Sequence, residues 1–400
     1  MRRNCWLTRS LLVVALAVAG AGAARAEEGR RHRGAVKLLT TVPVPSGNHL
    51  VVFDISWVDP ATQLYYLADR SDKAVDVVDA KRNVFVRQIK ANFKGFTGSN
   101  DTSGPNGVVV AGHWLFVTDA NSRIVSIDLR TDKVVSEVST GGAPDLRADE
   151  LAFDPEDGLL LPVNNADDPP FATLIKVDKQ TGKLTVGKRI TFDNATNGAE
   201  QPVCDAGTGR FYISIPELNG NVSEGAVGRI NPNGTLETLF PVRNCQPAGL
   251  SLGPRQDLLL GCSAVFDTAG KPWSASDKNT AVPTQIIMDA RTGKLDSTIK
   301  GVGGSDEVWF NEGDGRYYTA SRANPGGPVL GVIDAEDQEL VQVVPTFNTP
   351  ASSPPPRGTA HSVAANPHNN HVFVPLPANN VFPGCLDGCI AVFGTPRDDD

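Results

Sequence analysis

The segment that decides the fold is Leu115-Phe-Val-Thr-Asp-Ala-Asn-Ser-Arg-Ile-Val-Ser-Ile-Asp-Leu-Arg-Thr-Asp-Lys-Val-Val-Ser-Glu-Val-Ser139. It contains three short runs of mainly apolar residues, at 115–119, 124–127 and 134–138. Aspartate, asparagine and serine stand between the runs, and these residues favour tight turns. The segment therefore predicts three consecutive antiparallel strands.

The first of these runs has counterparts along the whole chain. Seven runs of this type lie at 64–69, 115–119, 159–163, 211–215, 258–262, 317–321 and 372–376. They start roughly every 45 to 60 residues, a period typical of propeller blades. A second run follows each of them, at 74–78, 124–127, 174–177, 227–230, 285–288, 330–333 and 389–393. We expect an all-β, seven-bladed β-propeller with four-stranded blades.

The two ends of the repeat predict how the ring closes. The last unit ends near Pro396 without its fourth strand, and a strand-like run at 35–43 precedes the first unit without a partner. We expect this N-terminal strand to complete the seventh blade, because closure removes the exposed edges of an open array.

The segment 115–139 resembles a repeat of the YVTN-type, or YncE-like, propellers, and the resemblance extends to 64–89. It implies the propeller fold. Haem-bearing nitrite reductases have related propellers, but this chain lacks their attached cytochrome domain and has no Cys-x-x-Cys-His motif. We therefore expect no haem.

The N-terminal residues have the pattern of a secretory signal. Arginines at 2 and 3 precede an apolar run at 11–19 and a small-residue stretch at 21–26. We expect residues 1–26 to be a signal peptide, 27–396 the propeller and 397–400 an acidic tail. No later run reaches the ~20 apolar residues that cross a bilayer. The protein is thus expected to be secreted or periplasmic, without a membrane span.

Removal of the signal would leave 33 basic against 45 acidic residues, a net charge of about −12. This excess of negative charge disfavours nucleic acid as a partner.

Five cysteines remain after residue 26, and an exported chain can keep disulfides. The turn at 253–256 lies midway between Cys245 and Cys262, which predicts a disulfide across a hairpin. Cys385 and Cys389 are expected to close a five-residue loop. Cys204 is left without a partner, and we expect it to be buried.

The connections of the blades differ in length between the two ends of the ring. Turns between first and second strands are short, whereas the other end receives long segments such as 164–171, 217–225, 263–284, 321–328 and 377–388. Long loops on a rigid scaffold usually carry binding. We expect a small molecule or a protein partner to bind on this loop-rich face.

Polar residues recur where the innermost strands begin, five residues before the first turn of a blade. The equivalent positions hold Asp54, Asn106, Asp149, Glu200, Ala248, Asp306 and His361, and the following positions add Glu150, Gln201 and Glu307. Converging carboxylates repel one another and need compensation. A divalent cation at the channel mouth, Ca²⁺ above all, would supply it, with Asn106, Glu150, Glu200, Asp306, Asp54 and Glu307 as candidate ligands. Alternatively, these groups bind neighbouring backbone and channel water.

Three further residues are candidates for ligand contact or chemistry. Trp273 lies in the longest loop, where it would cover a ligand or belong to the core, and Gln201 would face the ligand from the ring. His361 is the ring's histidine, which suits it to general base catalysis or to a structural role, and it would allow Zn²⁺ or Mn²⁺.

Two functions therefore compete. One is an exported propeller that binds a ligand on its loop-rich face. The other is a metal-dependent lactonase or esterase-like hydrolase, because the ring resembles that of the gluconolactonase and senescence-marker propellers at Pro105-Asn106-Gly107 and at Glu200. That resemblance implies an ion that polarises a carbonyl, with His361 or Asp149 handling protons.

Overall fold

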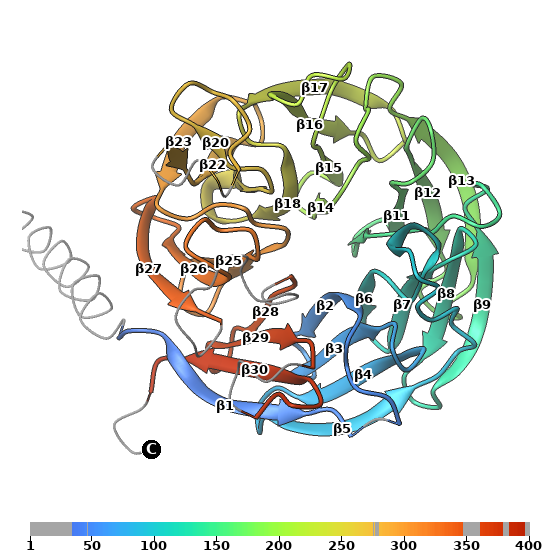
Figure 1. Cartoon of the computed structure of the whole chain (residues 1–400). Coiled ribbons are helices and arrows are strands. Elements are labelled where there is room, and N and C mark those ends of the chain that lie inside the picture. The colour runs from blue at the N-terminus through green and yellow to red at the C-terminus, as the bar shows by residue number, and fades with distance from the viewer. Residues whose placement is uncertain are drawn as a thin grey trace, which may run out of the picture.

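The protein is described from a computed structural model, in which residues 34–45, 47–274, 276, 280–346, 361–378 and 384–396 are placed. Seven four-stranded antiparallel sheets stand in a ring around a central axis (Figure 1). This confirms the predicted seven-bladed β-propeller. The predicted signal peptide and acidic tail lie outside the described residues, and no helix among the described residues is long and apolar enough to cross a membrane.

The blades follow one another along the chain. Blades one to three contain β2 (Phe53–Asp59), β3 (Leu64–Asp69), β4 (Ala74–Asp79) and β5 (Val84–Ile89); β6 (Val108–Ala111), β7 (Trp114–Asp119), β8 (Arg123–Asp128) and β9 (Lys133–Ser139); and β10 (Leu151–Asp154), β11 (Leu159–Asn164), β12 (Phe171–Val177) and β13 (Leu184–Thr191). Blades four to six contain β14 (Pro202–Asp205), β15 (Arg210–Ile215), β16 (Glu224–Ile230) and β17 (Leu236–Arg243); β18 (Pro247–Leu252), β19 (Asp257–Cys262), β22 (Thr284–Asp289) and β23 (Leu295–Lys300); and β24 (Val308–Asn311), β25 (Arg316–Ser321), β26 (Val329–Asp334) and β27 (Glu339–Pro345). Blade seven combines β28 (Ala364–Asn366), β29 (His371–Leu376) and β30 (Cys389–Gly394) with β1 (Lys37–Pro43). Two 3₁₀ turns, at Asn100–Thr102 and Pro254–Gln256, lie between strands.

The ring closes as predicted. β1, from the N-terminal end of the described chain, pairs antiparallel with β30, with Lys37 opposite Gly394 and Pro43 opposite Cys389. Figure 1 shows β1 as the outermost strand of blade seven, beside β30. The closing sheet therefore joins the two ends of the chain.

The core lies between neighbouring blades. The second and third strands are buried along almost their whole length, whereas the outermost strands alternate between exposed and half-buried side chains, as in β9. Tyr66 and Val77 of blade one pack against Val108 and Leu115 of blade two, and similar clusters lie between other neighbouring blades. Such face-to-face packing fixes the position and direction of each innermost strand.

The turns between first and second strands share one chemistry. In blade three, Asp154 Oδ1 accepts the backbone N–H of Glu156 at 2.9 Å, and Gly158 has φ of 64°, a left-handed conformation that favours glycine. Aspartate or asparagine binds the backbone two residues ahead in the same way in blades one, four, six and seven. These tight turns hold one end of the ring.

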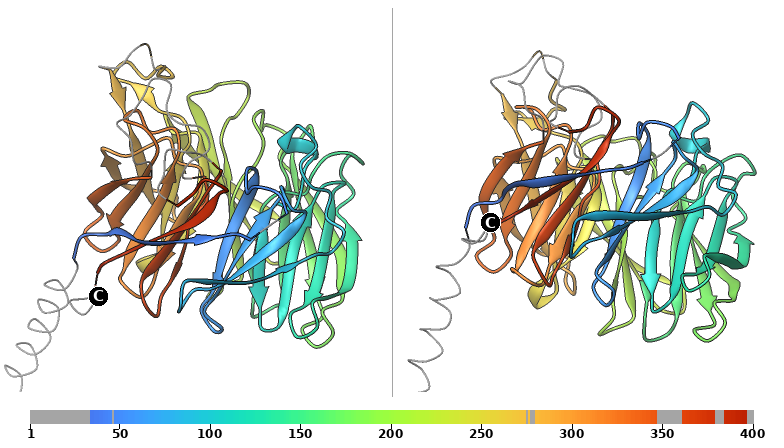
Figure 2. Two further views of the ribbon diagram at one scale, coloured as in Figure 1. Left: turned by 60° about the horizontal axis from the view of Figure 1, so that its bottom comes forward. Right: turned by 90° about the horizontal axis from the view of Figure 1, so that it is seen from below.

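The opposite end carries the long connections. The hairpin of β20 (Phe266–Asp267) and β21 (Ala281–Val282) is inserted between the second and third strands of blade five. Figure 2 shows it projecting from one end of the ring. The innermost strands begin at this same end, so the loop-rich face surrounds the channel mouth.

Candidate functional site

The polar residues that precede the innermost strands meet at the channel mouth. Their backbones leave the long connections immediately before β6, β10, β14, β24 and β28, and Asp54 lies near the start of β2. They surround a cavity of about 190 Å³. Its charged lining consists of Asp54, Arg147, Asp149, Glu150, Glu200, Asp306, Glu307, Arg322 and His361. Side chains from five blades thus converge on one small polar space.

Asp54 is the centre of a buried ion-pair network. Its Oδ2 accepts Nη2 of Arg70, which is only 2% exposed, and Nη1 of Arg147 at 3.3 Å. Its Oδ1 contacts Nε2 of His361 at 2.9 Å. Burial alone would raise the pKa of Asp54, but Arg70, His361 and Arg147 together hold that pKa well below its usual range. Asp54 is therefore an anion with three cationic partners.

Asp306 and His361 form the second part of this network. The Nδ1 atom of His361 lies 2.7 Å from Asp306 Oδ2, which also contacts Nη2 of Arg322 at 2.7 Å. Burial opposes the protonation of His361, yet Asp306 and Asp54 raise its pKa to about 9. The imidazole is thus charged at neutral pH with both nitrogens bonded, so it lacks the free lone pair of a general base.

Asp149 also has a cationic partner, since its Oδ2 lies 2.8 Å from Nη2 of Arg147. This side chain is 3% exposed. All three aspartates of the mouth are therefore bound to guanidinium groups, and two of them also bind His361.

The three glutamates of the mouth differ from the aspartates. Within the described part of the chain, no ion pair involves Glu150, Glu200 or Glu307. Glu307 is 2% exposed; its Oε2 accepts the hydroxyl of Ser362 at 3.0 Å, whereas its Oε1 has no hydrogen-bond partner. Burial and the neighbouring carboxylates raise the pKa of Glu150 well above its usual range, and burial raises that of Glu200 to about 7. The mouth thus has carboxyl groups without a counter-ion on three blades, and their raised pKa values favour the protonated form when no cation is bound.

Most of the residues proposed from sequence as cation ligands line the cavity. Five of them line the cavity: Asp54, Glu150, Glu200, Asp306 and Glu307. Asn106 lies behind the lining, where its Oδ1 accepts Nε and Nη2 of Arg70 at 3.0 and 2.6 Å and its Nδ2 donates to Ala148 O at 2.7 Å. Among the described residues, no three His, Cys, Asp or Glu side chains are arranged to hold a metal ion directly.

Gln201 and Trp273, the residues proposed for ligand contact, are not among the lining residues of this cavity. Gln201 Oε1 accepts the backbone N–H of Leu250 at 2.6 Å and so connects blade four to blade five. Trp273 is half-buried beside the β20–β21 hairpin, where its backbone N–H donates to Val265 O at 2.8 Å. Gln201 thus joins two blades, and Trp273 lies in the connection between β20 and β21.

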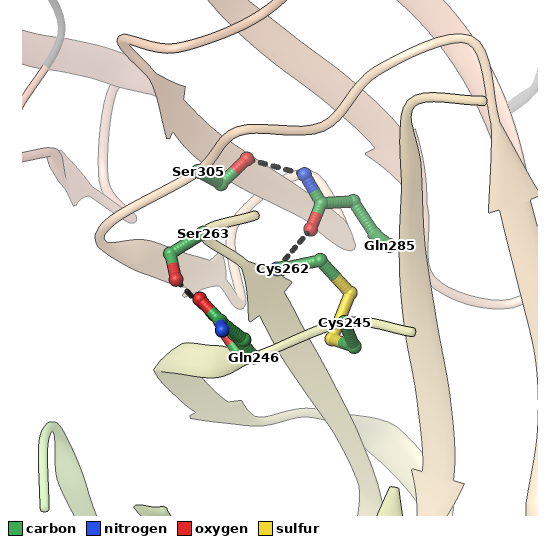
Figure 3. The surroundings of a disulfide bond; sticks show 6 residues. All are labelled: Cys245, Gln246, Cys262, Ser263, Gln285 and Ser305. Atoms are coloured by element: carbon green, nitrogen blue, oxygen red, sulfur yellow. Dashed lines mark hydrogen bonds between the residues drawn. A yellow bond between two sulfur atoms is a disulfide. The ribbon is translucent and has the colours of Figure 1, made fainter. Parts of the chain in front are cut away.

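A disulfide supports one wall of the cavity. Cys245 and Cys262 are bonded and fully buried. Figure 3 shows Cys262 followed by the lining residue Ser263, whose hydroxyl donates to Gln246 O at 2.8 Å. The Cys262 backbone binds Gln285 Oε1 at 2.8 Å, and the amide of Gln285 reaches Ser305, next to Asp306 (Figure 3). The disulfide thus fixes the first end of the loop that carries β20 and β21, and the hydrogen bond from Cys262 to Gln285 connects it to the second end.

Of the remaining cysteines, two form a second disulfide and one is a free thiol. Cys385 is bonded to Cys389, the first residue of β30. Cys204 carries a free thiol and is half-buried, less than the full burial we expected. Burial raises its pKa to outside the range in which a thiolate forms at neutral pH.

Sequence reasoning missed the three arginines of the mouth. Arg70 and Arg322 each follow directly after the second strand of a blade, β3 and β25, on the loop-rich face. Arg147 lies two residues before Asp149. The signal was available, because equivalent positions in two blades carry arginine and a ring of carboxylates requires nearby cations.

A scan against protein-family models finds none that matches, and a search of curated proteins likewise finds no match. The function is therefore argued from the geometry of the mouth.

Proposed function

We propose that this protein is a binding propeller that holds a small cationic ligand in the channel-mouth cavity. The proposal rests on the way in which the cationic side chains of the mouth are distributed among its carboxyl groups. Arg70, Arg147, Arg322 and His361 are all bound to aspartates, while Glu150, Glu200 and Glu307 have no cationic partner among the described residues. A ligand with positive charge would neutralise these glutamates.

The size of the cavity limits the ligand. A space of about 190 Å³ admits a hydrated divalent ion or a small organic ammonium compound, but is below the ~300 Å³ of ordinary drug-sized pockets. The positive charge can therefore belong to either of two kinds of ligand, a metal ion or a small organic amine. Ca²⁺ is the first candidate among ions, since glutamate oxygens are its preferred ligands. Because the glutamates do not form a ready-made direct coordination group, bridging water or a primary amine would span them.

The geometry favours binding over hydrolysis. The hydrolase hypothesis uses Asn106 as an ion ligand, yet both donors of Arg70 already occupy its carbonyl oxygen. It also uses His361 or Asp149 for proton transfer, and both are held in ion pairs. We therefore retain the binding function and propose no reaction.

Metal content and binding measurements test the proposal. The purified protein is analysed for bound metal, stripped with chelator, and titrated by calorimetry with Ca²⁺, Mn²⁺ and Zn²⁺ and, separately, with putrescine and ethanolamine. We expect one class to bind with a stoichiometry of one. Glu200→Gln and Glu307→Gln should each weaken this binding at least tenfold.

The matched control is Asp145→Asn, which removes the same charge from an exposed position in the connection before β10. It should leave the affinity unchanged. If neither class binds, or if the control weakens binding as much as Glu307→Gln does, the mouth is not a cation site and the proposal is wrong.

A further inference from the structure

A second buried acidic group lies in blade one, outside the cavity. Asp69 ends β3 and Asp76 lies in the adjoining strand β4, and both side chains are fully buried. Each carboxyl group has one oxygen, Oδ2, without a hydrogen-bond donor. Asp69 is paired with Ala74 across the two strands, so Asp76, two residues further on, is its diagonal neighbour on the same face of the sheet, and the two carboxyl groups are within hydrogen-bonding reach of each other. Two buried carboxylates in this position would repel each other strongly, whereas one shared proton joins them.

Within the described part of the chain, neither Asp69 nor Asp76 forms an ion pair. Gln88 of β5 donates through Nε2 to Asp76 Oδ1 at 2.9 Å and to Asp72 Oδ2 at 2.8 Å. Asp72 in the connecting loop adds a third negative group, and the Tyr65 hydroxyl of β3 is the other titratable group near Asp76. Asn48 from the segment before β2 binds Asp72 Oδ1 at 2.9 Å. The side chains described as binding or facing the two aspartates are therefore neutral or acidic, which favours a proton between them.

The pair is directly connected to the loop that carries Arg70. Asp69 Oδ1 accepts the backbone N–H groups of Ser71 at 2.7 Å and Asp72 at 3.2 Å, so this carboxyl group shapes the turn after β3. Arg70 stands inside that turn and extends its guanidinium to Asp54 at the channel mouth. A displacement of Asp69 would therefore move the main counter-ion of Asp54.

We infer that Asp69 and Asp76 share one proton and act as a pH-sensitive latch that holds the Arg70 loop closed. When the proton is lost, two buried anions remain face to face, and the turn at 69–74 opens to hydrate them. This inference does not depend on the ligand of the cavity. It rests only on the two aspartates, on the turn that Asp69 shapes and on the position of Arg70 in that turn.

The sign of the pH dependence follows from linkage. Burial and the neighbouring carboxylates raise the pKa of Asp69 from its ordinary 3.8 to about 7, and the pKa of Asp76 is raised further. The folded pair thus binds two protons below about pH 7 and keeps one shared proton above it, whereas the unfolded chain releases both above pH 4. The contribution to stability is complete below pH 4 and falls as the pH rises, by up to a factor of ten in the folding equilibrium per pH unit for each proton. The shared proton is lost last, as the pH passes the higher pKa of Asp76.

The first test compares urea unfolding between pH 4 and 8 for the wild type and Asp76→Asn. The amide of asparagine donates a hydrogen bond to Asp69 at every pH, so the slope of stability against pH should become shallower by up to one proton. Asp145→Asn, an exposed aspartate, should keep the wild-type slope. An unchanged slope in Asp76→Asn would overturn the inference. If that variant does not fold, Asp69→Asn makes the same comparison.

The second test reports on the loop itself and uses the wild-type protein. Trypsin cleavage after Arg70, identified by mass spectrometry and normalised to a small peptide substrate, should accelerate at least fivefold between about pH 7 and 9.5, where the shared proton is lost. Cleavage after the exposed Arg82, which lies in the turn after β4, should follow the peptide substrate. If cleavage after Arg70 shows no excess over Arg82, the latch does not open with pH and the inference is wrong.

Discussion

Replacement of Arg70 by methionine tests whether arginines hold the carboxylates of the channel mouth together. Arg70 is 2% exposed and donates to Asp54, Asn106 and Asn100. Removal of one partner from a buried ion pair costs about 3–5 kcal/mol. Asp54 keeps Arg147 and His361, which reduces this cost, but Asn106 Oδ1 loses both donors, which adds about 1–3 kcal/mol. We expect Arg70→Met to lower the free energy of unfolding by roughly 4 kcal/mol.

The assay is equilibrium unfolding in urea at pH 7, followed by tryptophan fluorescence. The matched control is Arg82→Met in the same blade. Its guanidinium contacts Asp79 at 2.9 Å but is 74% exposed, so its loss should cost at most about 1 kcal/mol. The double variant Arg70→Met/Asp54→Asn should recover part of the loss, because the uncompensated charge is gone. If Arg70→Met is no more destabilising than Arg82→Met, the ion-pair network does not hold the mouth.

Three further expectations concern the cavity and its wall. Replacing Cys245 and Cys262 by alanine should lower stability by about 3 kcal/mol, the value for a loop of 17 residues, whereas Cys204→Ala in the same assay should change it by much less. Glu307→Gln should leave thermal stability unchanged or raise it, since Oε1 has no partner to lose; a clear drop in melting temperature would contradict this. Cation affinity should rise with pH through about 7 as Glu200 deprotonates, and calorimetry on Glu200→Gln should show that part of the rise removed.

The architecture was predictable from sequence because it depends on local patterns. Each strand shows in a short apolar run, and the runs repeat at nearly constant spacing. The unpaired run at 35–43 identified β1 as the closing strand, and a turn midway between Cys245 and Cys262 placed those residues opposite each other. All of these features connect residues that are close in sequence or follow from counting repeats.

The position of the polar ring was also accessible, since every blade begins its innermost strand at the same end. Successive side chains of a strand point to opposite faces, but this alternation fails at two places. Asp149 and Glu150 are consecutive and both line the cavity, as do Asp306 and Glu307. They precede β10 and β24, where the backbone is not yet part of the sheet, so neighbouring side chains need not point to opposite faces.

The partners of the ring were not predictable by the same reasoning. Arg70 is 36 residues from Asn106, and His361 is 307 residues from Asp54. Such contacts depend on how seven blades converge and not on any local pattern. The chemical role of His361 changes accordingly, because two carboxylates that sequence cannot place beside it keep the imidazole charged.

The channel mouth thus contains two kinds of carboxyl group: aspartates that are held in ion pairs, and glutamates that are in none among the described residues. Asp54, Asp149 and Asp306 each have a guanidinium partner, so their charges help to hold blades one, three and six around the axis. The glutamates have longer side chains and start from blades three, four and six, yet no arginine reaches them with an ion pair in the described chain. A carboxyl group that is buried without a partner lowers stability, and a fold under selection for stability alone would replace it with glutamine. Three such groups around one cavity are therefore best explained by a positively charged ligand that stabilises them when it binds.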